Sequence, residues 1–347
     1  MLGRCRPSVV FIPSLLLLVA ATAVLPNAVG VPSASAQTSC VEQTLAIGAS
    51  AATPGFASLF GVATDSAGNI YAADAGNNTV YRFDAAGNQT LAIASADATP
   101  AFAFVSGVAA DDAGNIYVVD RASTAGGRVY RFDSVGNQTL SFANPTPNPD
   151  FVLASSIAAD ASGNIYVGDA FGDAIFRFDA TGTQNLVIAN PTPAPDFGQP
   201  VGVAVDPAGN IYVADNTGPA VFYFDAAGNQ TLVITPSAST PAFDNPLAVA
   251  ADGAGNVYVA DRSLGLYRFD AAGNQTLMIP LTAATPPLSD ITGIAADAAG
   301  ENIYATDTDT DTVYRFGVFD CPTPSAPPAP PTAPPAPTIV AEPTFTG

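Results

Sequence analysis

The residues best suited to chemistry in this sequence are its aspartates, because the chain has no histidine and its ten basic residues are all arginine. Asp307, Asp309 and Asp311 occupy alternate positions of one acidic segment. Carboxylate oxygens suit Ca²⁺, but the glycine and the terminal glutamate of the twelve-residue calcium loop are missing here. Two interpretations stay open for this segment: a Ca²⁺ site, or a turn whose carboxylates cap backbone N–H groups.

Six aspartates recur at one place in the sequence, each after an apolar run and before a loop that differs between copies. They are Asp74, Asp120, Asp169, Asp215, Asp261 and Asp307. The favoured interpretation is that each carboxylate caps the N–H groups of its own turn. The alternative is a shared acidic rim that binds Ca²⁺ or a cationic ligand. Because loops that vary on a constant scaffold carry binding sites, Asp169, Asp173 and Asp215 are kept as candidate ligand residues.

The arginines fall into two groups. Five of them recur just before the phenylalanine of one apolar run and are predicted to be structural: Arg82, Arg131, Arg177, Arg268 and Arg315. Arg121, Arg128 and Arg262 lie instead in the loops that differ between copies. These three are the candidates for binding an anionic or carboxylate ligand.

Composition narrows the function classes. A net charge of −20 repels phosphate backbones, so nucleic acid is not expected as a partner. Without histidine or lysine, catalysis could use only carboxylates, hydroxyls and a bound metal. No spacing singles out a pair of aspartates at the separation that a glycosidase needs. We therefore expect a binding module rather than an enzyme, with no catalytic residue assigned and no cofactor apart from the Ca²⁺ alternative.

These residues are set in six copies of one unit. The aspartates that open the copies are Asp65, Asp111, Asp160, Asp206, Asp252 and Asp297. In the fourth copy, apolar runs at 202–205, 211–214, 221–224 and 230–234 alternate with turns rich in Asp and Gly. This pattern predicts four antiparallel strands per unit. The copies are 45 to 49 residues apart, a period typical of a propeller or a solenoid, and the four strands of each copy form one sheet.

The two ends of the repeat region predict how the ring closes. The last copy lacks a fourth strand, whereas residues 43–47 match the fourth strand at residues 89–93 and precede the first copy. The sequence therefore predicts an all-β, six-bladed β-propeller of four-stranded antiparallel blades, closed by the N-terminal strand completing the last blade. The same register brings Cys40 and Cys321 to one turn of that blade, which predicts a Cys40–Cys321 disulfide across the closure.

The chain ends differ in composition from the repeats. Arg4 and Arg6, an apolar run at residues 9–25 and an Ala-Ser-Ala segment ending at Ala36 predict a secretory signal peptide at residues 1–36. An uncleaved anchor and a lipoprotein signal ending at Cys40 are the alternatives. Residues 37–321 form the predicted propeller, and residues 322–347 a Pro-rich, disordered tail. The mature chain is expected to be secreted or associated with the cell surface, monomeric, and without a transmembrane segment.

The pattern D-x-x-G-N-I-Y-V-A-D, followed by a V-x-x-F-D strand, resembles the NHL repeat over about residues 41–320. The chain is also similar to the six-bladed propellers of the SMP-30/gluconolactonase and streptogramin-lyase groups. The resemblance implies a propeller that binds ligands or proteins, or less often an enzyme. Such lyases use a histidine, which this chain lacks, and such lactonases hold a divalent cation with a glutamate. Glu42 and Glu301 do not fit that position.

Together these observations predict a secreted or cell-surface NHL-type propeller that binds a ligand through the face formed by its variable loops. The ligand is expected to be a protein, a carbohydrate or another small molecule. The alternative is a propeller hydrolase or lyase of the SMP-30/gluconolactonase type that uses a divalent cation.

Overall fold

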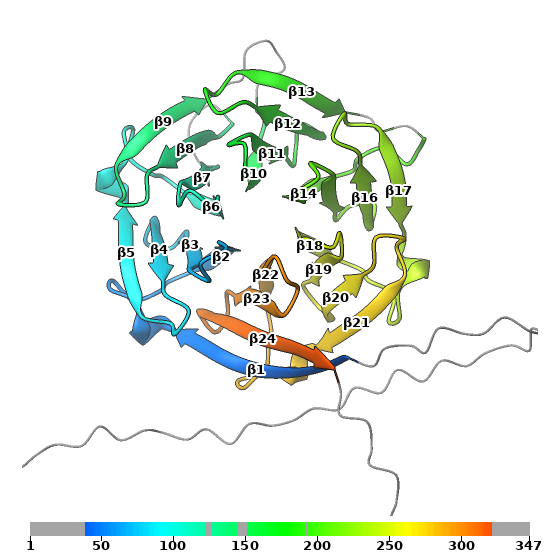
Figure 1. Ribbon diagram of the computed structural model, residues 1–347. Helices are drawn as coiled ribbons and strands as arrows, with labels where there is room; N and C mark the ends of the chain where they lie inside the picture. Colours follow the sequence, from blue (N-terminus) through cyan, green and yellow to red (C-terminus); the bar gives the residue numbers. More distant parts are fainter. Residues whose placement is uncertain (1–38, 122–125, 144–150, 190, 192, 321–347) are drawn as a thin grey trace, which may run out of the picture.

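The computed structural model describes residues 39–121, 126–143, 151–189, 191 and 193–320. These residues form six four-stranded antiparallel sheets arranged as blades around a central axis (Figure 1). In each blade the first strand lies nearest the axis and the fourth lies at the outer edge. The predicted all-β, six-bladed propeller is confirmed.

The strands have the following bounds. Blade 1 contains β2 (Leu59–Thr64), β3 (Ile70–Asp74), β4 (Thr79–Phe83) and β5 (Gln89–Ala94). Blade 2 contains β6 (Val105–Ala110), β7 (Ile116–Asp120), β8 (Arg128–Phe132) and β9 (Gln138–Ala143). Blade 3 contains β10 (Ala154–Ala159), β11 (Ile165–Asp169), β12 (Ala174–Phe178) and β13 (Gln184–Ala189). Blade 4 contains β14 (Pro200–Val205), β15 (Ile211–Asp215), β16 (Ala220–Phe224) and β17 (Gln230–Ile234). Blade 5 contains β18 (Pro246–Ala251), β19 (Val257–Asp261), β20 (Gly265–Phe269) and β21 (Gln275–Pro280). Blade 6 contains β22 (Ile291–Ala296), β23 (Asn302–Asp307), β24 (Thr312–Asp320) and β1 (Ser39–Gly48).

Short 3-10 turns follow several of the outer strands. They are η1 (Ala49–Ala51), η2 (Ser95–Asp97), η3 (Pro236–Ala238) and η4 (Leu281–Ala283). Within the described part of the chain, none of the helical segments has the length and apolar character needed to cross a membrane.

The repeated Asp-x-x-Gly-Asn motif forms the turn between the first and second strands. In blade 4, Asp206 Oδ1 accepts the N–H groups of Ala208 and Asn210, at 2.9 Å each. Its Oδ2 accepts the side-chain amide of Asn210 and the hydroxyl of Tyr212, at 2.8 Å each. Gly209 has a φ of 84°, a left-handed conformation that favours glycine. The most motif-like residues of the sequence are therefore used to fix the turn.

The hydrophobic core lies between neighbouring blades. The second strands of blades 1 to 5 are buried along their whole length, and β23 of blade 6 is buried at every position except Asn302, as expected for strands packed on both faces. The linkers add aromatic contacts: the ring of Phe56 meets Tyr81 edge-on at 5.2 Å, and the Tyr81 hydroxyl donates to the carbonyl of Pro54 at 2.7 Å. The recurring Pro-x-Phe segments thus tie each linker to the third strand of the blade that follows.

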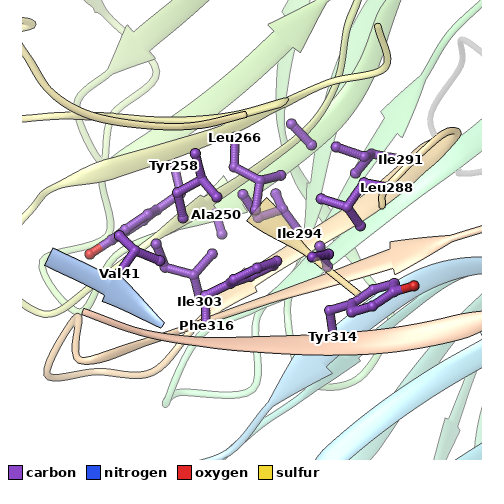
Figure 2. Close-up of a cluster of buried hydrophobic side chains, with 14 of the residues drawn as sticks. Val41, Ala250, Tyr258, Leu266, Leu288, Ile291, Ile294, Ile303, Tyr314 and Phe316 are labelled. Carbon is purple, nitrogen blue, oxygen red and sulfur yellow. The ribbon is translucent and has the colours of Figure 1, made fainter. Parts of the chain in front are cut away.

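The N-terminal strand closes the ring, as predicted. β1 pairs antiparallel with β24, from Ser39 opposite Asp320 to Gly48 opposite Thr312 (Figure 1). Val41 of β1 packs into the core cluster between blades 5 and 6, together with Tyr258 (Figure 2). Because no hairpin turn joins β1 to β24, both strands continue past the point where the other blades turn.

Three predictions about the ends reach beyond the described residues. Cys40 is buried in β1, opposite Phe319, but Cys321 lies outside the described residues, so the Cys40–Cys321 disulfide stays a prediction. The predicted signal peptide at residues 1–36 and the Pro-rich tail at residues 322–347 also lie outside them.

The recurring arginines connect one blade to the next. In blade 1, Arg82 donates from Nε to Thr90 Oγ1 at 2.9 Å, and from Nη1 to the carbonyl of Ser134 in blade 2 at 2.8 Å. Equivalent bonds between blades run from Arg131 to Ala180 and from Arg315 to Ala85, at 2.8 Å each. These residues act in the scaffold, in agreement with the prediction.

Candidate functional site

The two rims of the propeller differ in how much they vary among blades. We call the rim with the loops between second and third strands, and with the linkers between blades, the variable rim. Its loops include residues 75–78, 170–173, 216–219, 262–264 and 308–311. We call the opposite rim, with the Asp-x-x-Gly-Asn turns and the turns between third and fourth strands, the constant rim.

The six recurring aspartates at the variable rim are buried, with at most 1% of each residue exposed. Asp215 accepts the N–H groups of Gly198 (2.6 Å) and Gln199 (3.0 Å) from the linker. The same carboxylate accepts the N–H groups of Thr217 and Gly218 from its own loop, at 3.2 Å each. Asp74, Asp169, Asp261 and Asp307 likewise accept N–H groups from both a linker and a loop, so the interpretation as turn caps describes these carboxylates. For Asp120 the described contacts are those with the linker.

This geometry changes the role of two candidate ligand residues. Asp169 and Asp215 are fully buried, and their oxygens accept backbone N–H groups, including those of Val152 and Leu153 on Asp169 at 2.7 Å each. A carboxylate in that state has no face toward solvent, so both residues belong to the scaffold.

The three carboxylates of the acidic segment at 307–311 do not form a cluster. Asp307 is buried and accepts the N–H of Thr310 at 2.9 Å, whereas Asp309 is exposed. Asp311 has a φ of 46°, and burial is the main cause that raises its pKa. Among the described residues, no group of three or more His, Cys, Asp or Glu side chains is placed to hold a metal ion.

Two of the candidate arginines have local partners. Arg262 forms an ion pair with Asp290, with Nε 2.5 Å from Oδ1 and a second bond from Nη2 to Oδ2 at 2.9 Å. Arg128, at the start of β8, donates from Nη1 to Ser141 Oγ at 3.0 Å. Both stay on the variable rim, on blades 5 and 2.

Arg121 differs from both, because its guanidinium lies on aromatic rings. Its central carbon is 4.5 Å from the ring centre of Phe104 and 5.8 Å from that of Phe60, and the two rings meet edge-on at 5.4 Å. The backbone N–H of Arg121 donates to the carbonyl of Phe104 at 3.0 Å, which fixes the base of the side chain. We call these three residues the Arg121 cluster.

Among the described residues, the Arg121 guanidinium has no polar side-chain partner. Burial lowers its pKa, yet within the described ranges neither an ion pair nor a side-chain hydrogen bond engages it. A guanidinium that lies over an aromatic ring can still present two N–H groups to a carboxylate, which they match with two parallel bonds. The cluster therefore offers an anion-binding edge beside an apolar surface.

The Arg121 cluster lies beside the mouth of the central tunnel. Phe60 precedes Gly61 in β2. Gly61 lies close to Gly107 of the next blade, because a Cβ added to Gly61 would be 2.9 Å from the Cα of Gly107. The section of the tunnel that is lined by Gly61, Gly107 and their counterparts has a volume of only about 80 Å³. Its lining includes Ser106, Ser155, Val201, Leu247 and Thr292. This volume lies below the usual range of small-molecule pockets, so on the variable rim a ligand is better accommodated at the mouth than in this section of the tunnel.

Among the three acidic ligand candidates Asp169, Asp173 and Asp215, only Asp173 is not buried. It has a φ of 48°, like Asn78 in blade 1, whose side chain accepts the N–H of Val105 at 3.3 Å. In the blade after Asp173, the residue that corresponds to Val105 is Pro200, which has no N–H group to donate. The equivalent hydrogen bond to Asp173 therefore cannot form. Burial, then the charges of Asp215 and Asp169, raise the pKa of Asp173.

Two exposed apolar side chains flank this part of the variable rim. Phe171 is 61% exposed and Val152 is 56% exposed. Val152 donates its backbone N–H to Asp169, two residues before Phe171, so both lie on the rim of blade 3. The variable rim thus combines a cationic and aromatic cluster at blades 1 and 2 with an apolar and acidic patch at blade 3.

Phe60 and Phe104 were not predicted from the sequence. They occupy different positions of their repeats and come together only because the ring places β2 beside the linker that leads into β6. The sequence does show that Phe104 is unusual, because no other copy has an aromatic residue at this position. The corresponding residues are Ser58, Leu153, Gln199, Asn245 and Asp290.

The comparisons with known proteins support the repeat and the fold. The NHL repeat family model matches residues 197–218. A gluconolactonase from Xanthomonas campestris is similar in structure, with a TM-score of 0.59 at 15% identity, over 82% of this chain and 91% of that one. A streptogramin B lyase gives a TM-score of 0.57 at 12% identity, over 82% of this chain and 100% of that one. The PQQ-bound aldose sugar dehydrogenase from Streptomyces coelicolor gives 0.56 at 14%, over 82% and 99%.

No curated protein matches the sequence significantly. The expected resemblance to NHL-repeat propellers is confirmed by the repeat match and the six-bladed architecture. At these identities the similar structures establish the fold alone.

Proposed function

We propose that this chain is a secreted or cell-surface binding module that takes a carboxylate-bearing ligand on its variable rim. The Arg121 cluster would provide the anchor, with the guanidinium binding the carboxylate and Phe60 and Phe104 contacting an adjoining apolar group. The observation that carries this proposal is the half-buried Arg121 guanidinium, which lies over the ring of Phe104 and has no ion-pair partner in the described residues.

Desolvation explains why such an arginine suits binding. A guanidinium that is already partly shielded from water loses little further hydration when a ligand arrives, and a charge-assisted pair in such a place is stronger than one at an open surface. The surrounding surface is acidic, with a net charge of −20 for the whole chain. A polyanion would be repelled by that field, whereas a single carboxylate close to Arg121 is screened from most of it.

The module is proposed to act as a monomer outside the cell, after removal of residues 1–36. N-terminal sequencing of the exported chain tests this point, and a start at Gln37 is the expected result. The Pro-rich tail would act as an extended spacer behind the propeller.

The enzymatic alternative draws on the similar gluconolactonase and lyase structures, but no residue in the described ranges favours it. Ca²⁺ is the divalent cation to test first, because the alternate carboxylates of Asp307, Asp309 and Asp311 suggested a Ca²⁺ site in the sequence. Calorimetric titration of the protein with Ca²⁺ decides between a bound ion, which would give heat and a higher melting temperature, and no site.

Saturation-transfer NMR tests the proposed function. A panel of aromatic and aliphatic carboxylates, each paired with its neutral amide, is screened against the wild-type protein and against Arg121→Gln. We expect carboxylates but not amides to bind, with at least a tenfold loss in Arg121→Gln. Arg262→Gln is the matched control, because Arg262 lies on the same rim but is paired with Asp290. Equal binding by both variants, or no carboxylate binding to the wild type, would contradict the proposal.

A further inference from the structure

Blade 4 departs from the arginine pattern at the constant rim. Tyr223 of β16 occupies the position held by Arg82, Arg131, Arg177, Arg268 and Arg315 in the other blades. At the interface between blades 2 and 3, Arg131 donates to Thr139 Oγ1 at 2.9 Å and to the carbonyl of Ala180 at 2.8 Å. It also interacts with the hydroxyl of Tyr117.

The three acceptors that surround the guanidinium elsewhere are all retained at the interface between blades 4 and 5. They are the hydroxyl of Tyr212, Oγ1 of Thr231 and, by its place in the turn, the carbonyl of Ala271. All three residues line a cavity of about 350 Å³ between the two blades. This volume is at the lower end of the range that small-molecule sites span.

Tyr223 does not take over the bonds of the arginine. Its ring packs edge-on against Tyr212 at 4.9 Å, and the residue is 5% exposed. Its hydroxyl is buried and has no hydrogen-bond partner among the described residues. A buried hydroxyl in that state is costly to leave unpaired, so the cavity lies beside a polar group that a ligand could satisfy.

The charged groups closest to this cavity are carboxylates. Asp206 lines the cavity, and Asp252 and Asp270 are near enough to act on the tyrosine hydroxyls. In each of the other blades an arginine acts on the hydroxyl of the second-strand tyrosine, as Arg82 does on Tyr71, whereas no arginine of the described residues acts on Tyr212. Arg177 donates to the carbonyl of Ala226, on the other side of blade 4. The net charge of −20 adds a long-range attraction for cations.

We propose that the cavity between blades 4 and 5 binds a small alkylguanidinium cation, whose guanidinium takes the place that arginine side chains occupy at the other interfaces. Its N–H groups donate to Tyr212, Thr231 and Ala271, and its alkyl chain contacts the ring of Tyr223. The site is on the constant rim, opposite the Arg121 cluster, so its test is independent of the proposed function.

Isothermal titration calorimetry with n-butylguanidinium tests the site, with n-butylurea as the neutral counterpart of the same shape. The full mature protein is expected to bind one n-butylguanidinium and no n-butylurea. Tyr223→Arg restores the residue of the other blades, so the variant should fold, as circular dichroism can verify. It is expected to lose at least tenfold in affinity because its own guanidinium fills the cavity.

Val135→Arg is the matched control. Val135 is 70% exposed in a turn of the same rim, so this variant adds the same charge without filling the cavity. It should bind n-butylguanidinium within about twofold of the wild type. The proposal is overturned if the wild type gives no binding heat at millimolar ligand, if n-butylurea binds equally, or if both arginine variants lose affinity to the same extent.

Discussion

Asp215 was a candidate ligand residue, and the structure predicts that its removal damages the scaffold instead. In Asp215→Ala, four backbone N–H groups lose their shared carboxylate: those of Gly198, Gln199, Thr217 and Gly218. Hydrogen bonds to a charged group contribute about 1.5–3 kcal/mol each, but water can reach the exposed Gly198, Thr217 and Gly218 in the variant. We therefore expect a loss of about 3 kcal/mol in the free energy of unfolding.

Urea unfolding followed by circular dichroism measures this loss, and a thermal scan should show a fall in Tm of roughly 6–10 °C. Asp309→Ala is the control, because Asp309 is an exposed aspartate on the same rim. It should stay within about 0.5 kcal/mol of the wild type, as surface substitutions usually do. If Asp215→Ala were as stable as this control, the view that the recurring aspartates hold linkers to loops would be refuted.

Three further predictions concern stability. Arg131→Met removes the bond to Ala180 and should lower the free energy of unfolding by about 1–2 kcal/mol in urea titrations, whereas no change would argue against a role between blades. The pKa of Asp173 is raised in the folded state, so its ionisation opposes folding as pH rises above about 4. Asp173→Asn should therefore raise Tm at pH 7, and this gain should disappear below a pH of about 4. A gain in Tm that is independent of pH would contradict the prediction. The predicted Cys40–Cys321 disulfide closes nearly the whole propeller, so reduction should cost about 4 kcal/mol or more; two free thiols in the unreduced protein would exclude the bond.

The repeat explains why so much of the fold could be predicted. Six copies in register specify the strands and turns, and the unmatched strand at residues 43–47 specifies how the ring closes. The role of Arg82 could also be predicted, because a residue that recurs at one position beside a constant turn serves the scaffold. Such arguments work where every copy carries the same residue.

The candidate site was harder to predict because its residues differ from one copy to the next. The stack of Arg121 on Phe104 and Phe60 joins residues from two blades at different positions of their repeats, so no single copy displays it. Tyr223 was visible as an exception to five arginines, but only the packing between blades reveals the cavity that accompanies it. Asp169 was kept as a candidate ligand residue because it precedes a variable loop, but the linker N–H groups that cover its carboxylate come from a separate segment.

The claim that Arg121 anchors a carboxylate is tested most directly by the ¹H–¹⁵N signals of the arginine Nε groups. Removal of Arg4 and Arg6 with residues 1–36 would leave eight of the ten arginines, so each signal can be assigned by single substitutions. On titration with a carboxylate that binds, the Arg121 signal should shift with saturation, and the Arg262 signal should stay in place. A saturating shift at Arg262, or none at Arg121, would contradict the claim.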